Sequence, residues 1–86
     1  MAYAIAFLPT ALRELEELPA RIKIQISQRI AALADEPRPA NVKMLQGQHR
    51  YFRIRSGDYR VIYMIEDDVL VVLVVKVGHR REVYRK

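Results

Sequence analysis

Residues 69–77, VLVVLVVKV, constrain the fold more than any other segment, because eight of the nine side chains are apolar. Side chains of a strand point alternately to its two faces, and here both alternating sets are hydrophobic. Such a strand is expected inside a sheet, buried on both sides. Nine residues are far fewer than the roughly 20 that a membrane helix needs. We therefore expect a soluble protein whose core depends on this strand.

Three further segments have the pattern of strands. Residues 51–55 alternate as YFRIR and residues 59–65 follow the turn SGD, while a second turn, EDD, precedes the long apolar run. These segments predict an antiparallel meander of three strands. Residues 2–7 alternate without a breaker, which predicts an additional strand at the start of the chain.

Between residues 8 and 34 the apolar spacing becomes helical. Apolar residues at 8, 11, 12, 15 and 18 predict an amphipathic helix that ends before Pro19. Residues 21–26 alternate like a strand, but the apolar positions 22, 26, 30 and 33 and the alanines that follow favour a second helix. Residues 35–41 have the composition of a loop.

These elements predict an α+β fold of order β-α-α-β-β-β. In this fold the helical hairpin packs on one face of a mainly antiparallel, four-stranded twisted sheet. We expect residues 1–86 to form a single domain. The absence of cysteine, and a start that lacks the basic residues of a signal peptide, lead us to expect a cytoplasmic protein.

Positive charge is concentrated in the second half of the chain. Residues 1–42 hold five basic and five acidic residues, whereas residues 43–86 hold ten basic and five acidic ones. This asymmetry is typical of a protein that binds phosphate groups, although a basic patch also suits an acidic protein partner. The adjacent carboxylates at 66–68 are expected to scatter around a turn, so we predict no metal site and no cofactor.

Basic and aromatic side chains are expected to share one bare face of the sheet. Strand alternation places Tyr51, Arg53 and Arg55 on the same side, and Arg60 opens the neighbouring strand. Arg80 and Tyr84 follow the last strand, after a break that we predict at residue 78. Three separate segments could therefore bring cations around one concavity.

Three strings resemble the RelE toxins of bacterial and archaeal toxin–antitoxin systems. They are LQG at 45–47, YFRIRSGDYRVIY at 51–63 and VGHRREVYR at 77–85. The resemblance extends over almost the whole chain. It implies a ribosome-dependent endoribonuclease that cleaves mRNA in the A site and so inhibits translation. In this reaction the 2′-hydroxyl attacks the adjacent phosphate and leaves a 2′,3′-cyclic phosphate. A RelB-like antitoxin is the implied partner, and we expect one of its helices to cover or displace the basic C-terminal segment.

The resemblance also implies a set of site residues. Arg53 takes the place of a catalytic lysine of the family, a second family lysine falls on Tyr51, Arg60 and Arg80 match its two arginines, and Tyr84 matches its C-terminal tyrosine. The residues expected to bind RNA are Lys43, Arg50, Tyr51, Arg55, Arg81, Arg85 and Lys86. Guanidinium groups suit the charge that develops on the reacting phosphate, and a tyrosine can stack on an unstacked base.

The general base is the open part of this mechanism, because arginine stays protonated above pH ~12. His79 is the candidate whose ordinary pKa suits the role, and we include it in the expected catalytic set; His49, Glu82 and Tyr84 are alternatives. Two other functions are alternatives, although Arg53, Arg60, Arg80 and Tyr84 argue against the first of them. One is a ParE-like toxin that inhibits DNA gyrase, and the other is an RNA-binding or ribosome-binding module without catalysis.

Overall fold

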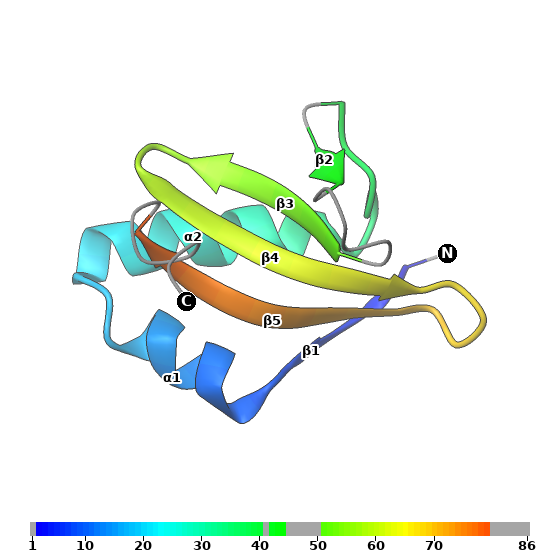
Figure 1. The fold of residues 1–86 in the computed structure, drawn as a ribbon, viewed down its shortest axis with the longest axis horizontal. Coiled ribbons are helices and arrows are strands. Elements are labelled where there is room, and N and C mark those ends of the chain that lie inside the picture. Colours follow the sequence, from blue (N-terminus) through cyan, green and yellow to red (C-terminus); the bar gives the residue numbers. More distant parts are fainter. Residues whose placement is uncertain (1, 41, 45–50, 80–86) are drawn as a thin grey trace.

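A computed structural model of the chain describes residues 2–40, 42–44 and 51–79. The order is β1 (Ala4–Phe7), α1 (Pro9–Glu16), α2 (Ala20–Ala32), β2 (Lys43–Met44), β3 (Tyr51–Ser56), β4 (Tyr59–Glu66) and β5 (Val71–His79). The predicted α+β order is confirmed, and the two-residue strand β2 is added to it. The strands form one mixed sheet of order β1-β5-β4-β3-β2, in which β1 is parallel to β5 and the other neighbours are antiparallel (Figure 1).

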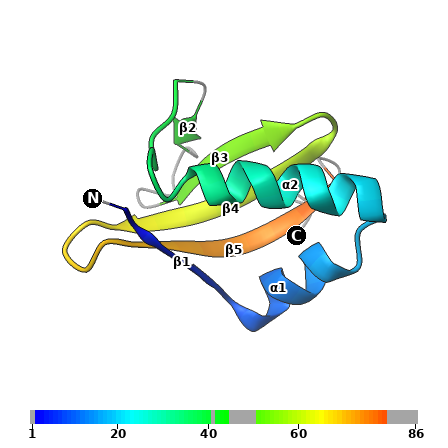
Figure 2. The same ribbon diagram turned by 180° about the vertical axis from the view of Figure 1, so that it is seen from behind.

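Both helices lie on the same side of the sheet, and α2 runs across it (Figure 2). Ala11 and Leu15 of α1 and Ile26 and Ile30 of α2 are buried, as the helical spacing predicts. Against them the sheet places the buried side chains of Ile54, Val61, Tyr63, Val72, Val74 and Val77. In the part of the chain that the structure describes, no helix covers the opposite face of the sheet (Figure 2).

β5 lies inside the sheet, between β1 and β4, as its apolar pattern predicts. Val72, Val74 and Val77 are buried against the helices, whereas Val71 and Leu73 on the other face are only half-buried. The prediction of burial on both sides is thus correct for the helix face and too strong for the other one. A bulge between β4 and β5 leaves Val75 without a partner, so the helix-facing positions shift from Val74 to Val77.

The ends of β5 differ from the predicted ones. Leu70 has a left-handed backbone with φ 56°, and its amide closes the turn by donating to the Asp67 carbonyl at 3.4 Å, so the strand begins only at Val71. The break predicted at Gly78 is wrong, because β5 continues through Gly78, paired with Arg60, to His79. At the other turn of the meander, Gly57 supplies the positive φ of 61° that a two-residue hairpin loop requires.

Candidate nucleic-acid interface

Strand pairing gathers four basic side chains on the sheet face that the helices leave open. Arg53 and Arg55 alternate along β3 with the core residue Ile54, so they point away from the helices. Arg55 is directly opposite Arg60 of β4, and cross-strand partners share a face. Lys43 of β2 is opposite Arg53 in the same way. The face expected from alternation alone is therefore present, and β2 extends it.

These cations line a hollow of about 210 Å³. Its lining residues are Ala40, Val42, Lys43, Arg53, Arg55 and Arg60, and we call it the cationic hollow. Four like charges around one hollow repel each other, which opposes folding unless an anion enters. A phosphate group fits this requirement, because guanidinium groups bind its oxygens through paired, charge-assisted hydrogen bonds.

Arg60 is the most unusual member of the cationic hollow, because only 8% of its surface is exposed. Its Nη1 donates to the carbonyls of Gly57 and Tyr59 at 3.5 and 3.3 Å, which are long for such bonds. Its buried Nε has no hydrogen-bond partner among the described residues. A buried charge without a full set of partners destabilises the fold. Arg60 is thus held ready for an anion at a cost in stability.

A side chain from α2 fixes the end of β3 that carries this site. Arg29 Nη2 donates to the carbonyl oxygen of Arg55 at 2.5 Å. β2 pairs with β3 only at Phe52 and Arg53, so among the described residues no strand lies beside the backbone of Arg55 on that side. Arg29 takes the place of a strand partner there and so holds the C-terminal end of β3 in position.

Other expected site residues lie apart from the cationic hollow. Tyr51 is on the same strand face as Arg53 but does not line the hollow. His79 is opposite Tyr59 and contacts its ring edge-on, with the ring centres 5.6 Å apart. Tyr59 packs against the core on the helix side, so the pairing directs His79 away from Arg60.

Several predicted residues fall outside the part of the chain that the structure describes. They are His49, Arg50, Arg80, Arg81, Glu82, Tyr84, Arg85 and Lys86. The described part therefore brings together Lys43, Arg53, Arg55 and Arg60 and separates His79 from them. Ala40 and Val42 are lining residues that the sequence did not suggest, because a loop without charge or periodicity carries no signal of this kind.

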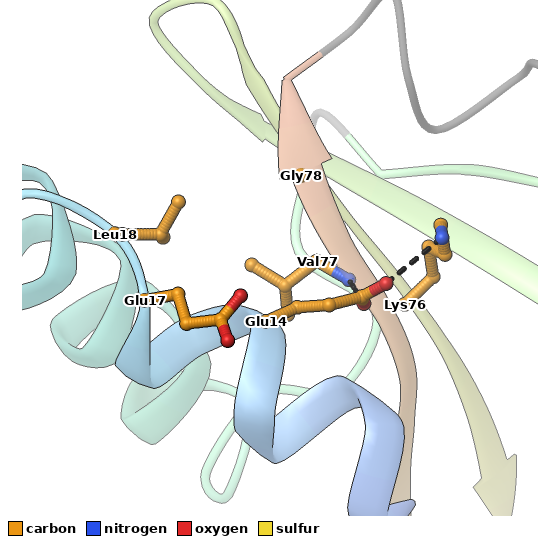
Figure 3. A pocket seen from close by; sticks show the side chains of 6 residues that line it. All are labelled: Glu14, Glu17, Leu18, Lys76, Val77 and Gly78. Atoms are coloured by element: carbon orange, nitrogen blue, oxygen red, sulfur yellow. Dashed lines mark hydrogen bonds and ion pairs between the residues drawn. The ribbon is translucent and has the colours of Figure 1, made fainter.

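A second hollow, of about 220 Å³, lies between α1 and β5. Glu14 accepts hydrogen bonds from Lys76 Nζ at 2.9 Å and from the Val77 amide at 3.0 Å, and Glu17 also lines the hollow (Figure 3). Two carboxylates beside a lysine that is already paired repel a phosphate. This hollow is therefore a poor site for nucleic acid, although it is as large as the cationic one.

The structure also bears on metals and membranes. Over the described ranges, no three histidine or acidic side chains come together in a group that could hold a metal ion. Nor is any helix in these ranges both long enough and apolar enough to span a bilayer.

Comparison with known proteins defines the class. A family model for the ParE toxin of type II toxin–antitoxin systems matches residues 5–84. The fold agrees with this class: the crystal structure of the isolated Escherichia coli RelE toxin aligns with a TM-score of 0.82 at 31% identity, covering 96% of this chain and 92% of that one. The toxin–antitoxin complex RelBE2 from Mycobacterium tuberculosis aligns with a TM-score of 0.81 at 32% identity, covering 93% of this chain and all of the matched one.

Sequence similarity narrows the class to a family. The toxin RelG of Mycobacterium tuberculosis is 32% identical over the full length of both chains. The mRNA interferase toxin RelE of Escherichia coli is 33% identical over 98% of this chain and 92% of its own. The chain belongs to the RelE/ParE family of toxins from type II toxin–antitoxin systems, as the motifs of its second half predicted.

Proposed function

We propose that this toxin is a metal-independent endoribonuclease that cleaves mRNA in the ribosomal A site. The observation that carries the proposal is the convergence of Lys43, Arg53, Arg55 and Arg60 on one hollow of about 210 Å³. It is supported by the similarity to a relative whose name is mRNA interferase toxin RelE. In the proposed reaction the 2′-hydroxyl attacks the adjacent phosphorus and the 5′-oxygen leaves. The products are a 2′,3′-cyclic phosphate and a 5′-hydroxyl.

The roles of the residues follow from their charge and placement. Arg60 and Arg53 stabilise the negative charge that grows on the non-bridging oxygens during attack. Arg80 and Tyr84, outside the described residues, are proposed to complete the site, with Tyr84 stacking on a base beside the cut. The side chains that line the cationic hollow are those of alanine, valine, lysine and arginine, and they include no imidazole or carboxylate that could serve as an ordinary general base. We therefore propose that orientation of the RNA and charge stabilisation supply most of the rate, and that His79 has at most an indirect part.

A RelB-like antitoxin is the proposed partner. Solved relatives include the RelBE2 complex of Mycobacterium tuberculosis and the intact RelBE complex of Escherichia coli, each a toxin with its antitoxin. We propose that the antitoxin of this toxin covers or displaces residues 80–86, which carry four basic residues.

The test is the mapping of mRNA ends in a purified translation system. Arg60→Met keeps much of the side-chain volume but removes the charge, and we expect it to lower cleavage by roughly 10²- to 10³-fold. Because a poorly partnered buried charge is lost, the same variant is expected to unfold no more easily than the wild type. Arg13→Met on α1 is the matched control, since it removes an exposed arginine outside the cationic hollow. Unchanged cleavage by Arg60→Met would contradict the proposal.

The matching family model is named for ParE, so inhibition of DNA gyrase is a second candidate function. A ParE-like toxin would inhibit DNA supercoiling by gyrase and leave mRNA intact. A binding module without catalysis would retain RNA but release no cyclic phosphate. The same purified protein can be assayed for all three outcomes.

A further inference from the structure

One wall of the cationic hollow comes from the loop between α2 and β2 and from the start of β2. Ala40 and Val42 of the loop and Lys43 of β2 form this wall, and the other lining residues are Arg53, Arg55 and Arg60. The Val42 amide donates to the Pro39 carbonyl at 3.0 Å, which closes a tight turn just before β2. The wall therefore has a defined local shape. Pairing of Lys43 with Arg53 holds it at the β2 end, and the contacts of residues upstream of Pro39 hold it at the other end.

The loop is held first through Pro37. This proline is buried, and its carbonyl accepts a hydrogen bond of 2.7 Å from the hydroxyl of Tyr63, a core residue of β4. The Phe52 ring stacks on Tyr63 with ring centres 5.9 Å apart. The Tyr63 hydrogen bond fixes the distance between the loop and the sheet at Pro37, and the Phe52 ring supports Tyr63. This bond holds only one backbone atom of the loop.

The loop is also held by three polar side chains from distant parts of the chain. Arg38 donates to both carboxylate oxygens of Asp67, at 2.9 and 3.4 Å, and its guanidinium lies 5.6 Å from the centre of the Phe52 ring. The Tyr3 hydroxyl donates to Asp67 Oδ1 at 2.7 Å. We call Tyr3, Arg38 and Asp67 the clamp. It joins the start of β1 and the β4–β5 turn to the loop.

The clamp is better suited to positioning than to stabilising the fold. The Arg38 and Asp67 side chains are 47% and 52% exposed, and exposed ion pairs contribute little to stability. Their geometry, however, is specific. Arg38 is fixed by a forked pair of bonds and by an aromatic ring, and only Pro39 separates it from Ala40 of the wall.

We propose that Arg38 and Asp67 are positioning residues for RNA, because they hold the wall of the cationic hollow in place through the clamp. The proposal rests on the proposed function, since it assigns the cationic hollow to RNA. Loosening the clamp lets Ala40 and Val42 move away from Arg53 and Arg60, while Lys43 stays paired with Arg53, so the hollow no longer surrounds a phosphate. Neither Arg38 nor Asp67 needs to touch the RNA for this effect.

A change of charge tests the proposal directly, because the proposal and simple electrostatics predict opposite changes in RNA affinity. Asp67→Asn makes the protein more positive, which by itself tightens RNA binding. The proposal predicts instead that binding of a short single-stranded RNA weakens by roughly three- to tenfold. Asp68→Asn is the matched control: it makes the same charge change in the same turn, and the exposed Asp68 carboxylate makes no hydrogen bond or ion pair with a described residue. Arg38→Lys keeps the charge but loses the forked pair of hydrogen bonds to Asp67, and it too is expected to weaken RNA binding.

Amide hydrogen exchange separates the clamp from the proposed function. Exchange of the Val42 amide should become faster in Asp67→Asn and in Arg38→Lys but not in Asp68→Asn, while core amides of β4 stay protected. The double variant should bind RNA no more weakly than the single ones, because either change opens the same clamp. Unchanged Val42 exchange, or RNA affinity in Asp67→Asn equal to that in Asp68→Asn, overturns the proposal. If the wild type leaves mRNA uncut, the proposed function fails, while Val42 exchange still decides whether the clamp holds the wall.

Discussion

Tyr63 combines full burial with a polar group that must be satisfied. Its side chain is 0% exposed, and its hydroxyl donates to the Pro37 carbonyl at 2.7 Å. Burial raises the pKa of Tyr63 to about 12, against a smaller opposing effect of the positive charge of Arg38. The residue therefore supports the core and the loop at once.

Tyr63→Phe should test this double role. Loss of the hydroxyl leaves the Pro37 carbonyl without its donor, so we expect the free energy of unfolding to fall by about 1–2 kcal/mol. Urea unfolding would measure it. Tyr59→Phe is the control, because the Tyr59 hydroxyl has no hydrogen-bond partner among the described residues. Equal losses in the two variants would contradict the assignment.

Because of its raised pKa, Tyr63 should make the stability of the fold depend on pH in the alkaline range. A tyrosine whose folded-state pKa lies above the unfolded value of about 10 contributes stability below that value and loses it as the pH rises toward 12. Between these values the wild type should lose stability faster than Tyr63→Phe. Parallel curves for the two proteins would show that the hydroxyl does not titrate as a buried group.

Among the elements, β5 shows a strand edge that a helix side chain completes. β1 pairs with β5 only as far as Val74, so no strand in the described ranges lies beside the Val77 amide. The Glu14 carboxylate accepts from this amide at 3.0 Å and also binds Lys76. An unpaired strand edge invites association with another chain, and a charged side chain on it prevents this.

Glu14→Ala should therefore destabilise the protein although Glu14 lies on a surface helix. The Val77 amide loses its acceptor, for which we expect a loss of about 1–2 kcal/mol in the free energy of unfolding. Glu16→Ala on the same helix removes an exposed carboxylate with no partner in the described part of the chain. Thermal unfolding of the two variants gives the comparison, and an equal effect of both would contradict the role given to Glu14.

The elements also show what periodicity can and cannot predict. The apolar run at 69–77 places β5 inside the sheet because burial follows directly from hydrophobicity. β2 could not be predicted, since two residues, Lys43 and Met44, become a strand only by pairing with β3. The start of β5 depends on the left-handed backbone of Leu70, a residue type that gives no local signal for it.

The site was predictable to a similar degree. Alternation predicts that Arg53 and Arg55 share a face, and the short turn at 56–58 brings Arg60 beside them. Alternation cannot show that Arg60 is buried or that Ala40 and Val42 close the cationic hollow, because both depend on the path of the α2–β2 loop. The sequence also suggested His79 by its ordinary pKa, whereas strand pairing directs it to the other side of the sheet.

For the molecule as a whole, the separation of layers explains how a small chain combines stability and function. The helices cover one face of the sheet and form the core, while the opposite face carries the cations of the cationic hollow. Both helices come from residues 1–42, which have no net charge. The strands that carry the cations come from residues 43–86, which hold the excess of positive charge. The cations gathered on this face are proposed to hold one phosphate of RNA.

The most direct test of this claim is the salt dependence of binding to a short single-stranded RNA. Each phosphate contact contributes about 0.7 to the slope of log K against log salt concentration. We predict that Arg60→Met reduces the slope by about this amount, whereas Arg13→Met leaves it unchanged. Equal slopes for wild type, Arg60→Met and Arg13→Met would show that the cationic hollow does not hold the phosphate.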